Sequence, residues 1–537
     1  MNDRASNPQA DKTEKLNTKA AGIIGLAVMA SRVLGLAREQ IQAALFGGGR
    51  VMDAFTAAFR IPNLLRDLFA EGALSTSFVT VFSKTIVNEG DAAAWRLANK
   101  VATLTAIALS ALTILGIVFA PALIAIIAPG FDASKAELTV TLARVMFPFI
   151  LLISLAALVM GVLNAKSVFG MPAMASSFFN LGSIIGGVTI GYWLDPSFGP
   201  QALVGLAVGT LIGGALQLAV QLPSLRRLGF RFHPDFRWRD AGVRAILVLM
   251  GPSVIAASST QVNVMINTVF ASSLGDGPTF WLNIAFRLMQ LPLGLFGVAL
   301  GTVTLPLLAR RVAMGDMETF RRELARGMRL AFLMTIPSTL GLMILAEPII
   351  SVLYQHGKFT ADETAQAAGA LRFYAVGLCG YAALKILVNA FYAIDKRKTP
   401  MIVSFVAVGM NLFFNWLFTF HLGWGHRGLA LSTGCVATTN FLLLYVLMRR
   451  HVKLLDTRLM ITLLWKTLIA GAILSTICWA GTHWLLRDWA TMHFLPKTAA
   501  LLATILAAGG AFFACALALR IRELVDITDA VMRRLRR

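Results

Sequence analysis

The sequence is built from long stretches that carry no charged residue, and this feature limits the possible folds more than any other. The stretches at 101–131, 167–194 and 245–275 are three examples. Each exceeds the roughly 20 residues that a helix needs to cross hydrocarbon. Only 14% of the residues are charged, whereas soluble domains carry about 25%. Because a helix satisfies its own backbone hydrogen bonds inside lipid, these stretches predict an all-α integral membrane protein.

The apolar stretches divide into about fourteen candidate transmembrane helices. They lie at 20–46, 52–84, 93–128, 137–165, 168–194, 201–226, 243–273, 277–309, 322–355, 363–394, 399–422, 427–449, 460–486 and 497–520. An even number of spans places both ends of the chain on the same side of the membrane.

The net charge of +21 is concentrated in short segments between these spans. Basic residues cluster at 226–239, 310–326, 396–398, 449–453 and 533–537, while the intervening loops at 195–200 and 272–278 contain no Lys or Arg. This alternation follows the positive-inside rule, so we expect a bacterial inner-membrane protein with both termini in the cytoplasm. A nucleic-acid partner is not expected, because that function needs a basic face on a soluble module.

Three polar segments flank or interrupt the spans. Residues 1–19 are interpreted as a cytoplasmic tail, and residues 522–537 as a second, basic one. Residues 229–242 form a cytoplasmic linker in which Phe230, Phe232, Phe236 and Trp238 lie among arginines. This linker is either an amphipathic segment at the membrane surface or a solvated connection between two halves.

An internal repeat indicates two lobes. A shift of 227 residues aligns AFRIPNLLRDLF at 58–69 with AFRLMQLPLGLF at 285–296. A shift of 228 pairs Arg144 with Arg372 and Pro172 with Pro400. Since this offset covers six spans, we predict parallel six-helix lobes at 20–228 and 243–451, followed by two additional helices within 459–521. Two such lobes around a central site are a transporter architecture.

Charged residues inside the expected spans are candidate functional residues, because a charge at bilayer depth is costly unless it faces a cavity or a partner. They are Arg32, Arg38, Arg60, Arg66, Asp67, Glu71, Arg287 and Lys385. Apolar sequence continues on both sides of Arg38, Arg66 and Arg287, which favours a central cationic cavity. The alternative, in which a long side chain reaches the membrane surface, fits Arg60, Arg144 and Arg372.

The sign of these charges indicates the ligand. Cations outnumber acids, and Asp67 and Glu71 can pair locally with Arg66. The planar guanidinium group binds phosphate through two parallel hydrogen bonds. The residues therefore predict an anionic ligand, such as a phosphate or pyrophosphate.

Motifs for catalysis or metal binding are absent from the sequence. It contains no HExxH motif, no Cys/His cluster and no phosphate-binding glycine motif. We therefore expect a transporter with no cofactor rather than an enzyme. Two pairs with i,i+4 spacing, Asn263/Asn267 and Asn411/Asn415, either coordinate a cation such as Na⁺ or form hydrogen bonds between helices. Glycines within 182–187 and 209–214 indicate close helix packing.

Four motifs resemble a known family. They are SRVLGLARE at 31–39, DAFTAAFRIPNLLRDLFAEGALSTSFVTVF at 53–82, FRLMQLPLGLFGVALGTVTLPLLA at 286–309 and HGKFTADET at 356–364. The sequence is similar to the MurJ (MviN) lipid II flippases of the MOP exporter superfamily from about residue 20 to residue 450, and the last two spans match in pattern only. The resemblance implies translocation of the undecaprenyl-pyrophosphate-linked peptidoglycan precursor from the cytoplasmic to the periplasmic leaflet by alternating access.

The resemblance also assigns roles to individual residues. Arg38, Arg66 and Arg287 match the arginines proposed to hold the pyrophosphate. The matched supporting residues of the cavity and gate are Ser31, Arg32, Asp53, Glu71 and Lys385. The last two spans would form a groove for the lipid tail. One departure is that Phe286 and Gln290 flank Arg287 where some members have acids, which argues against ion-pair gating there.

The expected partners are lipid II and the phospholipid bilayer, with cell-wall synthesis complexes as further candidates. Coupling to Na⁺, to H⁺ or to the membrane potential stays open. Two alternatives remain: a flippase for another undecaprenyl-linked glycan, such as an O-antigen unit, and a membrane glycan polymerase.

Overall fold

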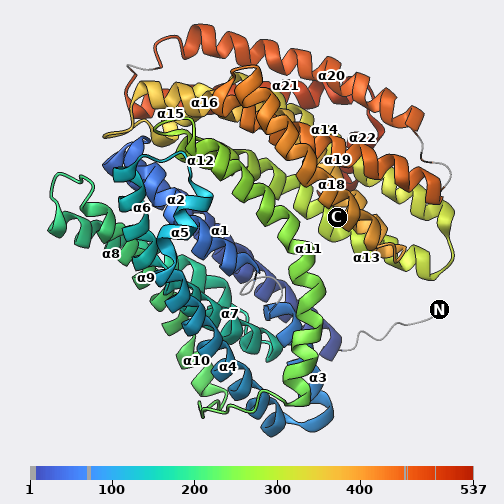
Figure 1. The fold of residues 1–537 in the computed structure, drawn as a ribbon. Coiled ribbons are helices and arrows are strands. Elements are labelled where there is room, and N and C mark those ends of the chain that lie inside the picture. The colour runs from blue at the N-terminus through green and yellow to red at the C-terminus, as the bar shows by residue number, and fades with distance from the viewer. Residues whose placement is uncertain (1–7, 69–73, 453–454, 456, 490–491, 536–537) are drawn as a thin grey trace, which may run out of the picture. The chain divides into compact units, whose positions relative to one another are not determined.

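The computed structural model describes residues 8–68, 74–452, 455, 457–489 and 492–535 (Figure 1). Within these ranges every regular element is a helix, which confirms the predicted fold class. Among the described residues, ten helices are long and apolar enough to cross a membrane, and two bent pairs raise the number to as many as twelve. The first two expected spans, 20–46 and 52–84, are not among these helices. Side chains of the first are described only from residue 25, and the second is interrupted at residues 69–73.

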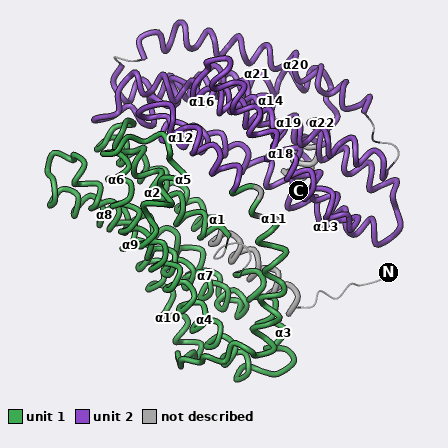
Figure 2. Tube along the Cα trace, viewed as in Figure 1, with its two compact units in different colours: residues 1–261 green, residues 262–537 purple. Residues whose placement is uncertain are grey.

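The chain divides into two compact units, residues 1–261 and 262–537 (Figure 2). The division falls inside α11 (Ala241–Ser272), which begins the expected second lobe. The other helices of the first unit are α1 (Pro8–Phe46), α2 (Arg50–Leu65), α3 (Ser75–Glu89), α4 (Asp91–Val118), α5 (Ala120–Ile127), α6 (Ala133–Met146), α7 (Phe149–Ala165), α8 (Gly170–Leu194), α9 (Ala202–Ala219) and α10 (Leu222–Arg227).

The second unit has a corresponding set of helices and then three more. Its elements are α12 (Pro278–Pro292), the π-helix η2 (Leu293–Val298), α13 (Ala299–Ala313), α14 (Met317–Ile344), α15 (Ala346–Tyr354), α16 (Ala361–Val376), α17 (Leu378–Ala393), α18 (Lys398–Trp416), η3 (Leu417–His421), α19 (Gly425–Val452), α20 (Thr457–Ala480), η4 (Gly481–Leu485), α21 (Phe494–Ala518) and α22 (Arg522–Leu535).

The same helix order and the same packing partners occur inside each unit. In the first unit α2 packs on α6, α3 on α4 and α7, and α9 on α7 and α8. In the second, α12 packs on α16, α13 on α14 and α17, and α19 on α17 and α18. Each helix of the second set carries the label of its counterpart plus ten. The repeat predicted from the sequence is therefore confirmed in the packing of the helices.

Arg144 and Arg372, which the repeat pairs, make equivalent contacts. The Nε of Arg144 donates to the carbonyl oxygen of Ile117 at 3.3 Å, near the end of α4, and the Nε of Arg372 donates to that of Met343 at 3.3 Å, near the end of α14. The last carbonyls of a helix lack partners within the helix, and a cation nearby is favourable. Both arginines thus stabilise helix ends.

Several expected spans are divided into two helices, and 93–128 and 322–355 are a matching pair of them. The first consists of α4 and α5, with the break at Phe119, and the second of α14 and α15, with the break at Leu345. Pro121 and Pro348 lie in the first turn of the following helix, where a proline without an N–H group is accepted. Hydropathy alone did not reveal these breaks.

The expected close packing of glycines is confirmed between α8 and α9. A Cβ atom at Gly205 would lie 2.2 Å from the backbone nitrogen of Gly191, and one at Gly209 would lie 2.4 Å from that of Gly187. Only glycine allows the two backbones to approach so closely.

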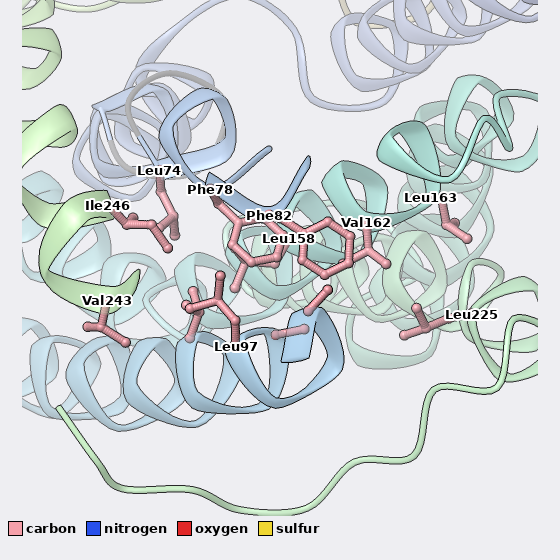
Figure 3. Close-up of a cluster of buried hydrophobic side chains, with 13 residues drawn as sticks. Leu74, Phe78, Phe82, Leu97, Leu158, Val162, Leu163, Leu225, Val243 and Ile246 are labelled. Atoms are coloured by element: carbon pink, nitrogen blue, oxygen red, sulfur yellow. The ribbon is translucent and has the colours of Figure 1, made fainter. Parts of the chain in front are cut away.

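A buried hydrophobic cluster connects α3, α4 and α7 with the end of α10 and the start of α11 (Figure 3). Its members are Leu74, Phe78, Phe82, Ala94, Leu97, Ala98, Val101, Leu158, Val162, Leu163, Leu225, Val243 and Ile246. Since Leu225 and Val243 stand at either end of the linker, the cluster fixes both of its ends within the first unit.

Candidate functional site

Two of the candidate residues on α1 face α8. The side-chain amide of Asn180 on α8 donates to the carbonyl oxygen of Ser31 at 3.1 Å. The guanidinium carbon of Arg38 lies 5.1 Å from the centre of the Phe179 ring, a distance at which a cation is attracted to the ring face. Arg32 is exposed. Residues 31 and 38 are seven positions apart, two helical turns, and therefore share one face of α1.

Arg66 comes directly after the last residue of α2, and it pairs with its neighbour in the sequence. Its Nη2 lies 2.9 Å from Oδ1 of Asp67. The other carboxylate oxygen, Oδ2, accepts a hydrogen bond from the side-chain amide of Gln261 at 3.2 Å. The prediction that Asp67 pairs locally with Arg66 is thus confirmed, while Glu71 lies outside the described residues. Both side chains of the pair remain partly exposed, so a ligand can still reach Arg66.

Asp53 belongs to a buried ion pair. Its Oδ2 lies 2.9 Å from Nζ of Lys135, and the two side chains are 0% and 2% exposed. Lys135 stands in the first turn of α6, where a positive charge is unfavourable because the helix dipole is positive at that end. The carboxylate of Asp53 compensates this charge and connects α2 to α6.

A second ion pair lies beside the first. Arg50 donates to both carboxylate oxygens of Asp132 and to Ser134, with Nη1 2.6 Å from Oδ2 of Asp132. Hydrogen bonds from Arg50 and from the backbone of Lys135 hold the pKa of Asp132 well below its usual range. Asp132 is also the N-cap of α6, so the starts of α2 and α6 are joined by two ion pairs.

The candidate cations of the second unit lie on exposed helix faces. On α12, Arg287, Gln290 and Leu291 are exposed, while Leu288 and Met289 are buried. Lys385 is exposed on α17. One turn further along α17, the side-chain amide of Asn389 donates to the carbonyl oxygen of Gly301 on α13 at 2.9 Å.

The candidate asparagines form hydrogen bonds between three helices. The amide nitrogen of Asn415 on α18 donates to Oδ1 of Asn267 on α11 at 2.8 Å and to Oδ1 of Asn411 at 3.1 Å. Asn267 in turn donates to Thr433 on α19 at 3.0 Å. The interhelical interpretation is therefore confirmed for Asn267 and Asn415.

Two carbonyl oxygens of this asparagine group remain available for a cation. Oδ1 of Asn263 and Oδ1 of Asn415 are buried, with no hydrogen-bond partner among the described residues. The groups are neutral, however, and across the described residues no three His, Cys, Asp or Glu side chains come close enough together to hold a metal ion. Neutral oxygens suit a monovalent cation better than a transition metal.

Sequence reasoning missed several residues that contact the candidates, among them Lys135, Phe179 and Gln261. Each belongs to a helix distant in the sequence from the residue it contacts. The only local signal was that Lys135 is a charged residue at the edge of an apolar stretch. The motif HGKFTADET, in contrast, has a structural role, because Thr360 and Glu363 form a capping box at the start of α16.

Comparisons with known proteins agree with the predicted family. The family model described as "Lipid II flippase MurJ" matches residues 42–500. The lipid II flippase MurJ of Burkholderia cenocepacia is 38% identical over 427 residues, 78% of this chain and 81% of that protein. The probable lipid II flippase MurJ of Rickettsia prowazekii is 30% identical over 501 residues, 93% of this chain and 97% of that protein.

Solved structures share the fold. A structure of lipid II flippase MurJ in an inward closed conformation matches with a TM-score of 0.73 and 26% identity, covering 91% of this chain and 98% of that one. An inward-facing MATE multidrug resistance transporter of the MOP superfamily matches with a TM-score of 0.68 and 16% identity, covering 81% of this chain and 99% of that one. On the strength of the family model and the relatives, the chain is a multi-pass membrane protein that belongs to the lipid II flippase MurJ family.

Proposed function

We propose that this protein is a lipid II flippase, which moves the undecaprenyl-pyrophosphate-linked precursor from the cytoplasmic to the periplasmic leaflet of the inner membrane. The observation that carries the proposal is the family match over residues 42–500. It is supported by Arg287 and Lys385, the single charged residues of α12 and α17, and by Arg38 and Arg66. All four side chains are at least partly exposed.

The proposed ligand of these cations is the pyrophosphate. A phosphate anion that leaves water loses its hydration, and the loss is large unless charged donors replace the water. Arginine supplies a planar fork that donates two hydrogen bonds to one phosphate. The guanidinium of Arg38 lies beside the ring of Phe179, and that of Arg66 pairs with Asp67.

The proposed cycle is alternating access with both termini in the cytoplasm. Each unit packs as a bundle of its own, which suits two lobes that move as bodies around a ligand. An inside-negative potential favours outward movement of an anion by about 2.3 kcal/mol per charge per 100 mV. We propose this potential as the driving force. Coupling to Na⁺ through the asparagine group is the alternative driving force.

Exposure of lipid II at the outer leaflet tests the function. In cells depleted of their own lipid II flippase, expression of this chain should restore exposure of lipid II to a periplasmic reagent and prevent lysis. An O-antigen-type flippase would leave the depleted cells to lyse, and would instead rescue cells that lack O-antigen export. A glycan polymerase would change the length of the glycan without changing the exposure of lipid II.

A further inference from the structure

The linker between α10 and α11 is an irregular segment with a defined position. Residues 230–237 form neither helix nor strand, although the segment is rich in aromatic residues and arginines. Both ends are fixed by the buried cluster that contains Leu225 and Val243 (Figure 3). All of these residues belong to the first unit.

Side chains of α4 hold the backbone of the linker. The amide group of Asn99 donates to the carbonyl oxygen of Arg231 at 3.2 Å and accepts from the backbone N–H of His233 at 3.0 Å. The hydroxyl oxygen of Thr103 accepts from the backbone N–H of Asp235 at 3.1 Å. These bonds satisfy backbone groups that an irregular segment would otherwise leave to water.

Two further contacts hold the ends of the linker. The ring of Phe230 lies 5.5 Å from the ring of Trp95, and Lys100 forms an ion pair with Asp240. Burial raises the pKa of Asp240, but hydrogen bonds from Lys100 and from the backbone of Gly242 lower it by more in total, so this carboxyl stays ionised. The linker is therefore bound along α4 rather than loosely connected.

The position of these contacts on α4 sets the depth of the linker in the membrane. Asn99 and Thr103 stand on either side of Val101, where the uncharged stretch of α4 begins. From Val101 to the end of the helix at Val118, α4 extends by roughly 26 Å at 1.5 Å per residue. This length is close to the ~30 Å thickness of the hydrocarbon core. The linker therefore crosses α4 where hydrocarbon gives way to lipid headgroups.

Large aromatic side chains point away from the protein at this depth. Phe232 is 56% exposed, Phe236 64% and Trp238 62%. Aromatic residues of this kind are enriched where membranes meet water, because the ring lies in the apolar zone and the backbone stays in the polar one. In a solvated linker the same side chains would be held in water.

The charge of the segment is complementary to anionic lipid. Residues 226–244 contain six arginines and two aspartates. Both aspartates are paired, Asp240 with Lys100 and Asp235 with Arg237 at 2.7 Å. The hydrogen bond from Arg237 lowers the pKa of Asp235 to about 2. Arg231 and Arg239 are exposed and have no carboxylate partner among the residues that the structure describes.

We propose that the linker is a membrane-surface anchor of the first unit and binds the headgroups of anionic phospholipids. Phe232, Phe236 and Trp238 enter the boundary between headgroups and acyl chains, and Arg231 and Arg239 contact lipid phosphates. The guanidinium of Arg239 lies over the Trp238 ring, 4.8 Å from its centre. The charged group and the aromatic group of the anchor are therefore next to each other. This anchor is a binding surface separate from the flippase site and does not depend on the proposed substrate.

Depth measurement by spin labelling tests the location. The four native cysteines (Cys379, Cys435, Cys478 and Cys515) are replaced, and a nitroxide is attached to Phe236→Cys in the full chain in lipid nanodiscs. We expect collisions with O₂ to exceed those with a water-soluble nickel chelate, and to do so more strongly with phosphatidylglycerol than with phosphatidylcholine alone. The matched label at Arg397→Cys, an exposed basic loop position, should show the reverse ratio.

The alternatives give different results in the same measurement. Nickel accessibility equal to that at position 397 would mean a solvated linker and overturn the proposal. Protection from both reagents would mean that the linker binds protein, and would overturn it as well.

Lipid retention tests the role of charge. Each arginine near an anionic surface strengthens association by roughly fivefold. Arg231→Gln with Arg239→Gln should lower several-fold the ratio of phosphatidylglycerol to phosphatidylcholine that stays with the protein through purification, measured by mass spectrometry. The control variant, Arg449→Gln with Arg450→Gln, removes the same charge from an exposed basic cluster at the end of α19, outside the linker. It should change the ratio little. An equal loss in both variants would contradict a specific anionic-lipid site at the linker.

Discussion

At the scale of single residues, Asp53 has two candidate roles: a gate residue, and one half of a buried ion pair with Lys135. The resemblance implied a gate function for Asp53, and the structure gives it a buried partner on α6. A buried charge that loses its partner destabilises a protein by about 3–5 kcal/mol, whereas replacement of both partners by apolar groups is often tolerated. A loss of activity on replacement of Asp53 can therefore arise from folding, from gating or from both.

A double-mutant cycle separates these contributions. Asp53→Ala should lower the melting temperature of the purified protein clearly, because Lys135 is then buried without compensation. Asp53→Ala combined with Lys135→Met should recover most of that loss. If the double variant is stable and still fails to expose lipid II, Asp53 has a role in transport as well. An unchanged melting temperature in the single variant would contradict the stabilising role of the pair.

The proposed binding of pyrophosphate by the three candidate arginines depends on both the positive charge and the planar shape of the guanidinium group. Arg38→Ala, Arg66→Ala and Arg287→Ala should each abolish complementation at normal abundance, since removal of a charge makes membrane insertion easier. Substitution by Lys should restore only part of the activity, because Lys lacks the fork. Arg144→Ala is the matched control. It removes a helix-end contact and should lower abundance rather than specific activity.

These three positions also distinguish the pyrophosphate proposal from a surface-reaching role. If the arginines only reach the membrane surface, Lys will replace them without loss. Full complementation by Ala at two of the three positions, at normal expression, would rule out their role in holding the pyrophosphate.

At the scale of helices, the contact between α8 and α9 depends on small residues. Gly205→Ala and Gly209→Ala would place a Cβ atom less than 3 Å from the backbone of α8. Such overpacking destabilises by about 1–3 kcal/mol. Gly509→Ala and Gly510→Ala, on α21, are the controls: a Cβ there meets nothing within 4 Å, and Ala is favoured over Gly in a helix by about 0.5–1 kcal/mol. Thermal unfolding in detergent should separate the two pairs, and equal stability would contradict the packing argument.

Helices and their repeat were predictable because they follow from local signals. The length of each apolar stretch, and the offset between motifs, can be read without knowing the fold, and they gave the order later seen in α2–α9 and α12–α19. The break at Phe119 was missed because hydropathy does not report a change in the direction of the helix axis within an apolar stretch. Pro121 was a local sign of the break. Contacts such as Arg38 with Phe179 were beyond reach, because they depend on how α1 and α8 pack.

At the scale of the whole molecule, the topology follows from the basic segments and can be checked at exposed positions. Cysteine at Pro196 or Ser273 should react with a membrane-impermeant maleimide in intact cells from which the outer membrane has been permeabilised. Cysteine at Arg237 or Arg397 should react only after the inner membrane is opened, because these loops belong to the basic set. All four positions are exposed. Labelling of Arg397→Cys in intact cells would reverse the proposed orientation.

The proposed function requires that lipid II moves through this chain, and translocation in proteoliposomes under an imposed potential measures that movement most directly. The purified protein is reconstituted with labelled lipid II, a K⁺ gradient with valinomycin sets the potential, and an impermeant enzyme reports the lipid II that has crossed. We predict translocation that requires the protein, accelerates when the receiving side is positive, slows when the polarity is reversed, and does not need Na⁺. Translocation no faster than in protein-free vesicles would contradict the function. A protein-dependent rate that ignores the potential and stops without Na⁺ would contradict the driving force and favour the asparagine group as an ion site.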